Sequence, residues 1–256
     1  MRDFTSNRLQ LLLSSLKSTG YSFTTVAGYL RNPSDSTVIL RHDVDARPAN
    51  SLKCAEMEHR MGITGTYYFR ILRGSYDESV IRHINSLGHE IGYHYEDLAA
   101  AKGEYEKAIT LFGENLAKLR LVAPVETICM HGSPMSIHDN RLLWQKYDYR
   151  DFGICGEPYL DIDFMKVHYL TDTGRRWNGE KFSVRDRVNT HLTKGKGRLK
   201  FRSTRDLIRA AESGGLPSML MITIHPQRWD NRLIPWMQEL IWQNIKNAVK
   251  RSMTAS

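Results

Sequence analysis

The sequence predicts an α/β fold in which helices cover a parallel sheet that is either open or closed into a barrel. Short apolar strands alternate with amphipathic helices, and the connections between them are short. Of the 256 residues, 41% are hydrophobic and 25% are charged, which is the composition of a globular domain and excludes a disordered or fibrous chain. No repeat or linker divides the chain, so we expect one domain over residues 1–256.

Helix and strand signals alternate through the first half of the chain. Leucines at helical spacing predict an N-terminal helix over residues 4–18, and a short apolar run predicts a strand over 37–40. The elements expected next are a helix over 46–61 ended by Gly62, a strand over 66–69, a helix over 76–87 ended by Gly88, and a strand over 89–93. This succession is typical of a parallel sheet.

The same alternation continues toward the C-terminus. The expected elements are helices over 105–121, 140–146 and 204–213 and strands over 127–130 and 219–224. No apolar run is long enough to span a membrane, and the N-terminal apolar stretch lacks a clear signal-peptide cleavage site. Three widely spaced cysteines without a CxxC pair fit reduced thiols, so we expect a cytoplasmic protein.

Positive charge is concentrated in one segment. The formal net charge is +8, and residues 175–209 alone hold 12 basic and 3 acidic residues, a net of +9. This basic insertion is either a solvated loop or a binding surface for an anionic sugar, a phosphate or an acidic membrane surface. Nucleic acid is the weaker interpretation because we find no recognition helix, zinc finger or ribonucleoprotein aromatic pattern.

Histidines and carboxylates follow four of the expected strands. In parallel α/β folds, ligands bind at the carboxyl ends of the strands, so these side chains are expected to face one pocket. They are His42, Asp43 and Asp45 after the first strand, His94 and Glu96 after residues 89–93, His131 after residues 127–130, and His225 after residues 219–224. The conjunction predicts a ring of metal ligands and acid/base groups.

The Asp43-Val44-Asp45 string suits a metal ligand beside a general base. At a strand end the two carboxylates can separate, so that one binds the ion and the other stays next to it. Imidazole and carboxylate together favour zinc, with cobalt, nickel, iron and manganese as alternatives. The competing interpretation is that Asp45 merely caps the following helix.

These strings resemble those of the polysaccharide deacetylase superfamily, carbohydrate esterase family 4. The resemblance lies in Leu40-Arg-His-Asp-Val-Asp45, Gly88-His-Glu-Ile-Gly-Tyr-His94 and Ile222-Thr-Ile-His225, and it covers residues 37–230, the expected catalytic core. It implies a distorted (β/α) barrel of about seven parallel strands and metal-dependent removal of an N-acyl group. It also implies that Asp43 is the general base, Asp45 and His94 are metal ligands, and His225 is the acid that protonates the leaving nitrogen.

The sequence departs from the family pattern at the second metal histidine. The family places this histidine four residues after the first, where this chain has Leu98. Glu96 and His131 are the available replacements, and the sequence does not decide between them. His131 also stands where the family usually carries an arginine that orients the base.

Two further strings are expected to shape the substrate side. The Thr171-Asp-Thr-Gly-Arg-Arg-Trp177 run resembles the acidic, Trp-containing family motif, in which Asp172 would contact a catalytic group and Trp177 would stack on a sugar; Trp177 is alternatively a core residue. Arg175 and Arg228 are candidates to clamp a carboxylate or phosphate of the substrate. Together with the basic segment, they suggest an anionic glycan or nucleotide-linked sugar.

The sequence therefore predicts a divalent-metal hydrolase that removes an acetyl-type N-acyl group from a sugar. The resemblance implies a role in surface polysaccharide or O-antigen (lipopolysaccharide) biosynthesis. Two alternatives remain open at this point. One is a different C–N hydrolase on the same barrel, acting on a ureide or formamide, and the other is a non-catalytic glycan- or phosphate-binding module.

Overall fold

A computed structural model describes residues 2–133, 135–177, 199 and 201–254, with side chains described up to residue 248. All seven described strands belong to one parallel sheet with the order β5-β4-β3-β2-β7-β6, and β1 pairs with β2 beside this path. The predicted parallel α/β fold of about seven strands is therefore confirmed. The terminal strands β5 and β6 are not hydrogen-bonded to each other, so strand pairing does not close the barrel between them.

The strands are short, and the longest lies at the centre of the sheet. Their bounds are β1 Ser22–Thr24, β2 Thr37–Val44, β3 Thr66–Phe69, β4 Glu90–Tyr95, β5 Val125–Met130, β6 His168–Thr171 and β7 Met219–Ile224. All eight residues of β2 are buried, because β7 covers one of its edges while β1 and β3 share the other. A strand buried on both faces and both edges reads as a continuous apolar run, which is why its first half was recognisable from sequence.

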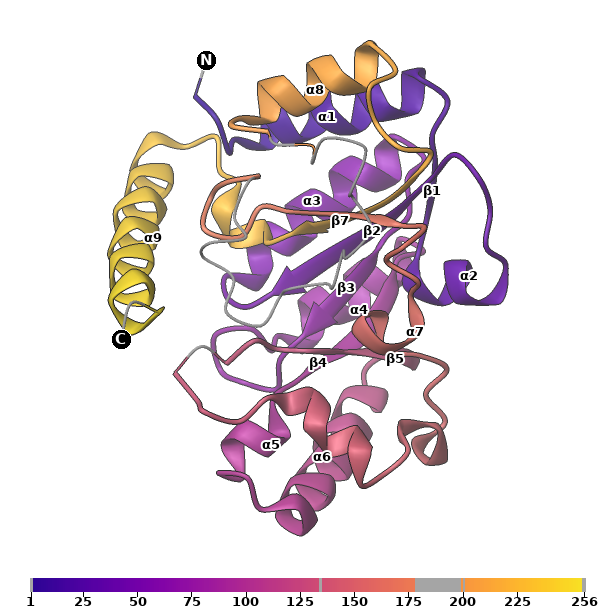
Figure 1. Ribbon diagram of the computed structural model, residues 1–256, viewed down its shortest axis with the longest axis vertical. Coiled ribbons are helices and arrows are strands. Elements are labelled where there is room, and N and C mark those ends of the chain that lie inside the picture. The colour runs from indigo at the N-terminus through magenta and orange to yellow at the C-terminus, as the bar shows by residue number, and fades with distance from the viewer. Residues whose placement is uncertain (1, 134, 178–198, 200, 255–256) are drawn as a thin grey trace.

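The helices cover the sheet as the alternating pattern predicts. Their bounds are α1 Ser6–Ser18, α2 Val26–Arg31, α3 Pro48–Arg60, α4 Glu78–Ser86, α5 Asp97–Ala100, α6 Tyr105–Arg120, α7 Pro158–Asp161, α8 Thr204–Glu212 and α9 Leu233–Thr254. Helices α1 and α8 lie side by side at one end of the molecule although they are far apart in sequence (Figure 1). The buried leucines of α1, at positions 9, 12, 13 and 16, form the apolar face that the spacing predicts.

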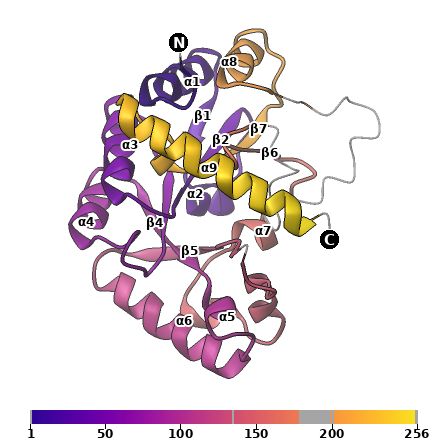
Figure 2. The same cartoon turned by 90° about the vertical axis from the view of Figure 1, so that its left-hand side faces the viewer.

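The largest difference from the sequence-based expectation is α9, a helix of 22 residues that was not predicted. It crosses in front of the sheet (Figure 2). Strand β6 and the short helices α2, α5 and α7 were also not predicted, and the expected helix over 140–146 is a 3-10 helix over Asn140–Gln145. Within the described residues, no helix is both long enough and apolar enough to cross a membrane.

Candidate active site

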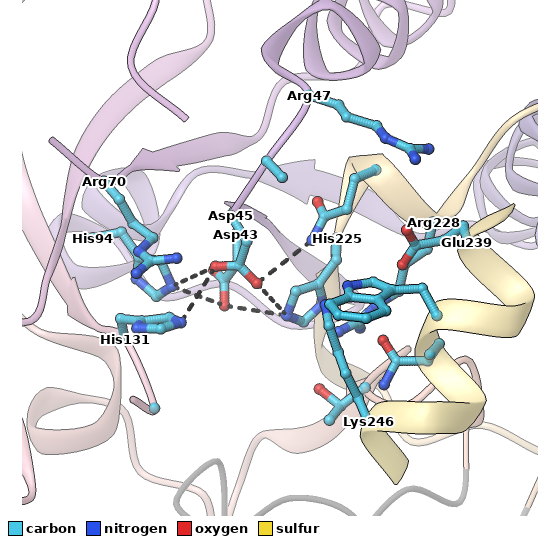
Figure 3. Close-up of a pocket in the computed structure, with 16 residues that line it drawn as sticks. Asp43, Asp45, Arg47, Arg70, His94, His131, His225, Arg228, Glu239 and Lys246 are labelled. Atoms are coloured by element: carbon cyan, nitrogen blue, oxygen red, sulfur yellow. Dashed lines mark hydrogen bonds and ion pairs between the residues drawn. The ribbon is translucent and has the colours of Figure 1, made fainter. Parts of the chain in front are cut away.

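A cavity of about 370 Å³ opens at the carboxyl ends of the strands. It brings together five of the predicted histidines and carboxylates, Asp43, Asp45, His94, His131 and His225, whose side chains point toward one another (Figure 3). Residues of α9 form another part of its wall: Glu239, Trp242, Gln243 and Lys246. These five side chains, which follow four different strands in the sequence, therefore face one cavity.

Asp43 is held by an arginine of its own strand. Residues two apart on a strand share a face, and Arg41 forms a two-pronged ion pair with Asp43, with 2.7 Å from Nε to Oδ1 and 2.7 Å from Nη2 to Oδ2. Both side chains are almost fully buried. Burial raises the pKa of Asp43, but Arg41 and the neighbouring imidazoles outweigh it and hold the pKa below its ordinary value. Asp43 is therefore an ionised, fixed carboxylate.

His225 is held by a second carboxylate. Its Nδ1 lies 2.6 Å from Oδ1 of the fully buried Asp172, and its backbone N–H donates to Oδ2 of the same residue at 3.0 Å. Arg228 Nη1 and Trp229 Nε1 also donate to this carboxylate, each at 2.7 Å. Burial raises the pKa of Asp172, but the charge of Arg228 and the His225 imidazole lower it to about 2. Asp172 thus contacts the candidate acid, as the sequence motif suggests.

His94 presents one ring nitrogen to the cavity. Its Nδ1 lies 2.9 Å from the backbone oxygen of Cys129 on β5, so Nδ1 carries the proton and Nε2 has a free lone pair. Burial lowers the pKa of His94 to about 4, and the imidazole is therefore neutral at neutral pH. Two residues earlier on β4, Gly92 leaves room for the ring of Tyr68, because a Cβ there would lie 2.2 Å from that ring.

His131 shows the same arrangement with a carboxylate behind it. Its Nδ1 lies 2.8 Å from Oε2 of Glu96, whose Oε1 accepts from Arg70 Nη2 at 2.6 Å. Burial raises the pKa of Glu96, but its hydrogen bond to His131 and the charge of Arg70 lower it to about 2. Glu96 therefore orients His131, which leaves Nε2 of His131 directed at the cavity. A carboxylate behind a ligating histidine is a common feature of metal sites.

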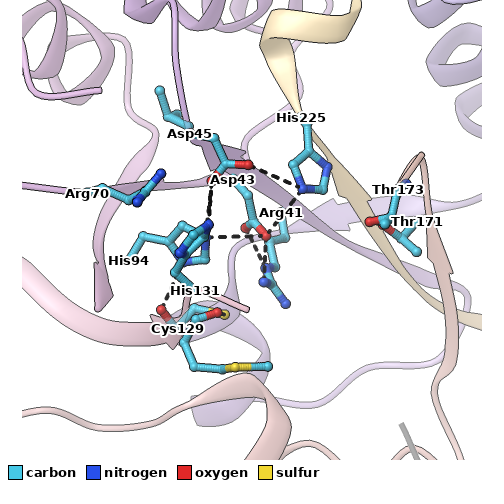
Figure 4. Close-up of polar contacts among 12 residues, drawn as sticks. Arg41, Asp43, Asp45, Arg70, His94, Cys129, His131, Thr171, Thr173 and His225 are labelled. Carbon is cyan, nitrogen blue, oxygen red and sulfur yellow. Dashed lines mark hydrogen bonds and ion pairs between the residues drawn. The ribbon is translucent and has the colours of Figure 1, made fainter. Parts of the chain in front are cut away.

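Asp45 lies between the pair of imidazoles of His94 and His131 on one side and the imidazole of His225 on the other (Figure 4). Its Oδ1 is 3.6 Å from His94 Nε2 and 3.7 Å from His131 Nε2, and this buried atom accepts no hydrogen bond from the described residues. Burial raises the pKa of Asp45, but the histidines lower it below its ordinary value. Helix α3 begins at Pro48 with Arg47 as its N-cap, so Asp45 does not cap it. An unpaired carboxylate oxygen beside two imidazole lone pairs fits a divalent metal ion.

Among the described residues, the three potential ligand atoms that all lie within 4.8 Å of one another are those of Asp43, His94 and Cys129. We favour Asp45, His94 and His131 instead for two reasons. Both oxygens of Asp43 are engaged by Arg41, and Cys129 is buried in the hydrophobic core and does not line the cavity. The residues that fit a metal best are therefore Asp45, His94 and His131.

Two predicted substrate residues are placed away from the cavity. Trp177 is a buried core residue whose Nε1 donates to Thr204 Oγ1 at 2.9 Å, and it does not line the cavity. Arg175 is buried against the rings of Phe4 and Trp236 and donates to the backbone oxygen of Arg228. The alternative expectation for Trp177, a core position, is the one that matches, and neither residue is placed to contact a ligand in this cavity.

Arg228 lines the cavity, but its guanidinium binds Asp172, the carboxylate that also holds His225. Most of the basic segment, residues 178–198 and 200, lies outside the described residues.

Sequence reasoning missed Arg41 and the part of the cavity wall that α9 forms. Arg41 could have been found from its position two residues before Asp43 on the same strand face, whereas nothing in the sequence places α9 over the site.

The comparisons with known proteins add one finding. No family model matches the chain, and no curated protein matches it. Among solved structures, the chain is similar to the carbohydrate esterase family 4 (Xyl-CE4) domain of a multidomain xylanase from the hindgut metagenome of Trinervitermes trinervoides. The identity is 13%, the match covers 82% of this chain and 83% of that chain, and the TM-score is 0.39.

Proposed function

We propose that this protein is a metal-dependent hydrolase that removes an N-acyl group, such as acetyl, from a sugar. One observation carries the proposal. A carboxylate–imidazole cluster suited to a metal lies in the same cavity as two separately held proton-transfer groups, Asp43 and His225. Amide hydrolysis needs these three functions together: activation of water and carbonyl, a base, and an acid for the leaving nitrogen.

Asp45, His94 and His131 would hold the ion, with His94 fixed by Cys129 O and His131 fixed by Glu96. Three protein ligands leave a coordination position open, as catalytic rather than structural zinc sites do. When bound, a divalent ion supplies polarisation of the acyl carbonyl and a lowered pKa for water. Zinc is our first choice, and the same ligands suit cobalt, nickel, iron and manganese.

Asp43 would take the proton from the attacking water. Its Oδ2 lies 3.8 Å from His94 Nε2 and 4.0 Å from His225 Nε2, so it faces the position between the metal ligands and the acid. Arg41 keeps this carboxylate ionised and stops it from rotating. A fixed, ionised carboxylate in the cavity is the geometry that a general base requires.

His225 would donate the proton that lets the nitrogen leave. Asp172 accepts from Nδ1, so Nε2 is the atom turned toward the cavity, 3.9 Å from Asp45 Oδ2 and 4.0 Å from Asp43 Oδ2. The charge of Asp172 stabilises the imidazolium form that the acid must adopt. Asp43 and His225 thus line the same cavity, where Asp43 would accept a proton and His225 would donate one.

The proposal also includes a substrate class, an anionic acylated sugar. A cavity of about 370 Å³ is within the range of small-molecule sites, and Arg47 and Lys246 add positive charge to its lining. This charge favours an anionic acylated sugar, for example a nucleotide-linked one. We further propose, from the sequence resemblance, that the reaction belongs to surface-glycan synthesis in the cytoplasm.

The test is release of acetate or formate from N-acylated sugars by protein reconstituted with zinc, cobalt, nickel or manganese. The panel contains N-acetylglucosamine oligomers, UDP-N-acetylglucosamine and their N-formyl counterparts. We expect turnover of an N-acetyl sugar by the wild type and none by Asp43→Asn, which keeps the three proposed ligands and therefore the metal.

Two results would replace the proposal. Turnover of the N-formyl compounds alone would identify a different C–N hydrolase. Sugar binding without turnover under every metal, unchanged in Asp43→Asn, would identify a binding module.

A further inference from the structure

The side chains of α9 that line the cavity lie on one face of this helix. They are Glu239, Trp242, Gln243 and Lys246, at positions i, i+3, i+4 and i+7, and we call them the cavity face of α9. They are a carboxylate, an indole, an amide and an ammonium group. The cavity face therefore offers hydrogen-bond acceptors and donors around one aromatic ring, which suits a ligand with many hydroxyl groups.

Helix α9 is fixed to the protein on both sides of the cavity face. Near its start, Trp236 Nε1 donates to the backbone oxygen of Asp3 at 2.7 Å. Further along, Asn247 Nδ2 donates to the backbone oxygen of Gly174 at 3.1 Å, and Asn247 Oδ1 accepts from Gln243 Nε2 at 2.9 Å. These contacts hold the cavity face in a set position, as a binding wall requires.

Two buried acceptors that line the cavity lack partners. Glu239 is 6% exposed, and no described residue forms a hydrogen bond or ion pair with its carboxylate. Gln227 is 7% exposed, and its Oε1 has no hydrogen-bond partner among the described residues. A buried acceptor without a donor costs free energy, so both groups favour a ligand that brings O–H or N–H donors. The hydroxyl groups of a sugar are such donors.

Trp242 and Lys246 stand together on the cavity face. Trp242 is 54% exposed, and the Lys246 ammonium lies 5.3 Å from the centre of its ring. A half-exposed indole in a cavity wall can stack on the apolar face of a sugar ring. No described residue forms an ion pair with Lys246. Burial lowers the pKa of Lys246, and the charges of Arg228 and Arg47 lower it further, so an anionic group on the ligand would stabilise this ammonium.

The proposed reaction requires the sugar to lie on the α9 side of the cavity. His225 would protonate the leaving nitrogen, and this nitrogen is bonded to the sugar. Figure 3 shows Glu239 and Lys246 on the same side as His225, and the proposed metal histidines on the opposite side. A sugar that carries this nitrogen therefore extends from His225 toward the cavity face of α9.

We propose that the cavity face of α9 is the sugar-binding subsite, in which Trp242 stacks on the sugar ring and Lys246 binds an anionic group attached to it. Glu239 and Gln227 accept hydrogen bonds from the sugar hydroxyls. Lys246 follows Glu239 by seven residues, about 10 Å along the helix axis, so this carboxylate stays apart from the anionic group. The assignment rests on the proposed function for the position of the sugar, and it adds the residues that select the substrate.

The test is a ligand-observed NMR titration of the full chain carrying Asp43→Asn, in which the probes are expected to stay intact. The probes are N-acetylglucosamine, its 1-phosphate and N-acetylmuramic acid, so that the same acylated ring is neutral, phosphorylated or carboxylated. We expect one of the two anionic probes to bind at least about tenfold more tightly than the neutral one, because its charge meets the unpaired ammonium. Lys246→Gln should remove this difference and leave the affinity for the neutral probe unchanged.

Trp242→Ala should weaken the binding of all three probes at least about tenfold, because the stacking surface is lost. Trp242→Phe, which keeps an aromatic ring, should restore part of the affinity. Ile241→Ala is the matched control, since Ile241 is the neighbouring residue of α9 and is 57% exposed but does not line the cavity. Its affinities should equal those of the parent protein, and circular dichroism identifies any variant that fails to fold.

The outcomes separate this subsite from the proposed hydrolysis. Binding that Trp242→Ala leaves unchanged, or no binding of any probe, would overturn the subsite. Equal affinities for the neutral and anionic probes would overturn the role of Lys246. Acetate release with the same KM in wild type and Trp242→Ala would overturn the subsite and leave the hydrolysis standing. Loss of binding in Trp242→Ala without acetate release under any metal would support the subsite and reject the hydrolysis.

Discussion

Two groups of histidines lie near the same sheet and differ in how their ring nitrogens are used. His42 and His89, on the side of α3, have partners at both nitrogens: His42 contacts Glu58 and Thr66 O, and His89 contacts Gly65 N and Ala55 O. In the cavity, His94, His131 and His225 each have Nδ1 in a hydrogen bond, and Nε2 of each is 3.6 Å or more from the nearest carboxylate oxygen.

The comparison separates a structural histidine from a functional one without knowledge of the ligand. A buried ring with both nitrogens satisfied stabilises the fold and has nothing left to bind with. A ring fixed through Nδ1, with Nε2 turned into a cavity, is oriented for a metal or for proton transfer. Strand β2 supplies both kinds of surroundings, because His42 and Asp43 point to opposite faces of the sheet.

The largest expected effect is on Asp45. Asp45→Ala removes the unpaired oxygen between His94 and His131, so we expect loss of bound metal and a fall in turnover of about 10⁴-fold. Metal analysis and acetate release measure the two effects. Retention of both in a folded Asp45→Ala protein would remove Asp45 from the metal site.

The next effect is on the partner of His225. Asp172→Asn should lower turnover about 10²- to 10⁴-fold while metal content is retained, because the imidazolium loses its carboxylate. The pKa of Asp172 is depressed to about 2, so its contribution to stability is present above the unfolded-state pKa of about 4 and is lost as the pH falls toward 2. Acid unfolding of the variant should therefore depend less on pH in this window. An unchanged acid transition would show that Asp172 is not held as an ion.

A smaller effect is expected for Glu96, which contacts Nδ1 of His131. Glu96→Gln should weaken metal affinity about 10- to 100-fold, because the imidazole loses the carboxylate that orients it. Glu90→Gln is the matched control, since Glu90 lies on β4 but binds Ala27 N and Thr66 Oγ1 away from the cavity. Competition with a coloured chelator measures both affinities, and equal weakening in the two variants would argue against a specific role for Glu96.

The smallest effect on activity is expected for Glu58, which contacts the structural histidine His42. Glu58→Gln disturbs the bonds to His42 and Tyr67 and should lower the free energy of unfolding by about 1–3 kcal/mol. Metal content and turnover per folded chain should stay unchanged. Denaturant unfolding measures the free energy of unfolding. A loss of metal in this variant would show that the structural histidines and the cavity histidines are not independent.

The sequence predicted the parallel sheet and five cavity residues because both depend on local patterns. An apolar run followed by His or Asp shows where a strand ends, and parallel strands bring their ends together. The choice between Glu96 and His131 was not available from sequence, since it depends on which atom of each residue turns inward. Trp177 resembled a sugar platform but is packed in the core, where Thr204 satisfies its indole N–H.

Helix α9 was missed for a different reason. The apolar residues Ile234, Met237, Ile241 and Ile245 have helical spacing, so the helix itself was recognisable, but their side chains are exposed and the polar Glu239 and Gln243 face the cavity, which the sequence does not show. Arg41 was overlooked because an arginine inside an apolar strand is uncommon unless a charge beside it requires one, and here that charge is Asp43. Both positions deviate from the rules that locate the core.

The most direct test of the account is the metal content of three proteins purified without an affinity tag: wild type, His131→Ala and Cys129→Ala. Cys129 belongs to the alternative ligand set, so the two variants separate the two possible sites. We predict about one divalent ion per chain in the wild type and in Cys129→Ala, and loss of the ion in His131→Ala. Loss in Cys129→Ala with retention in His131→Ala would contradict the site formed by Asp45, His94 and His131.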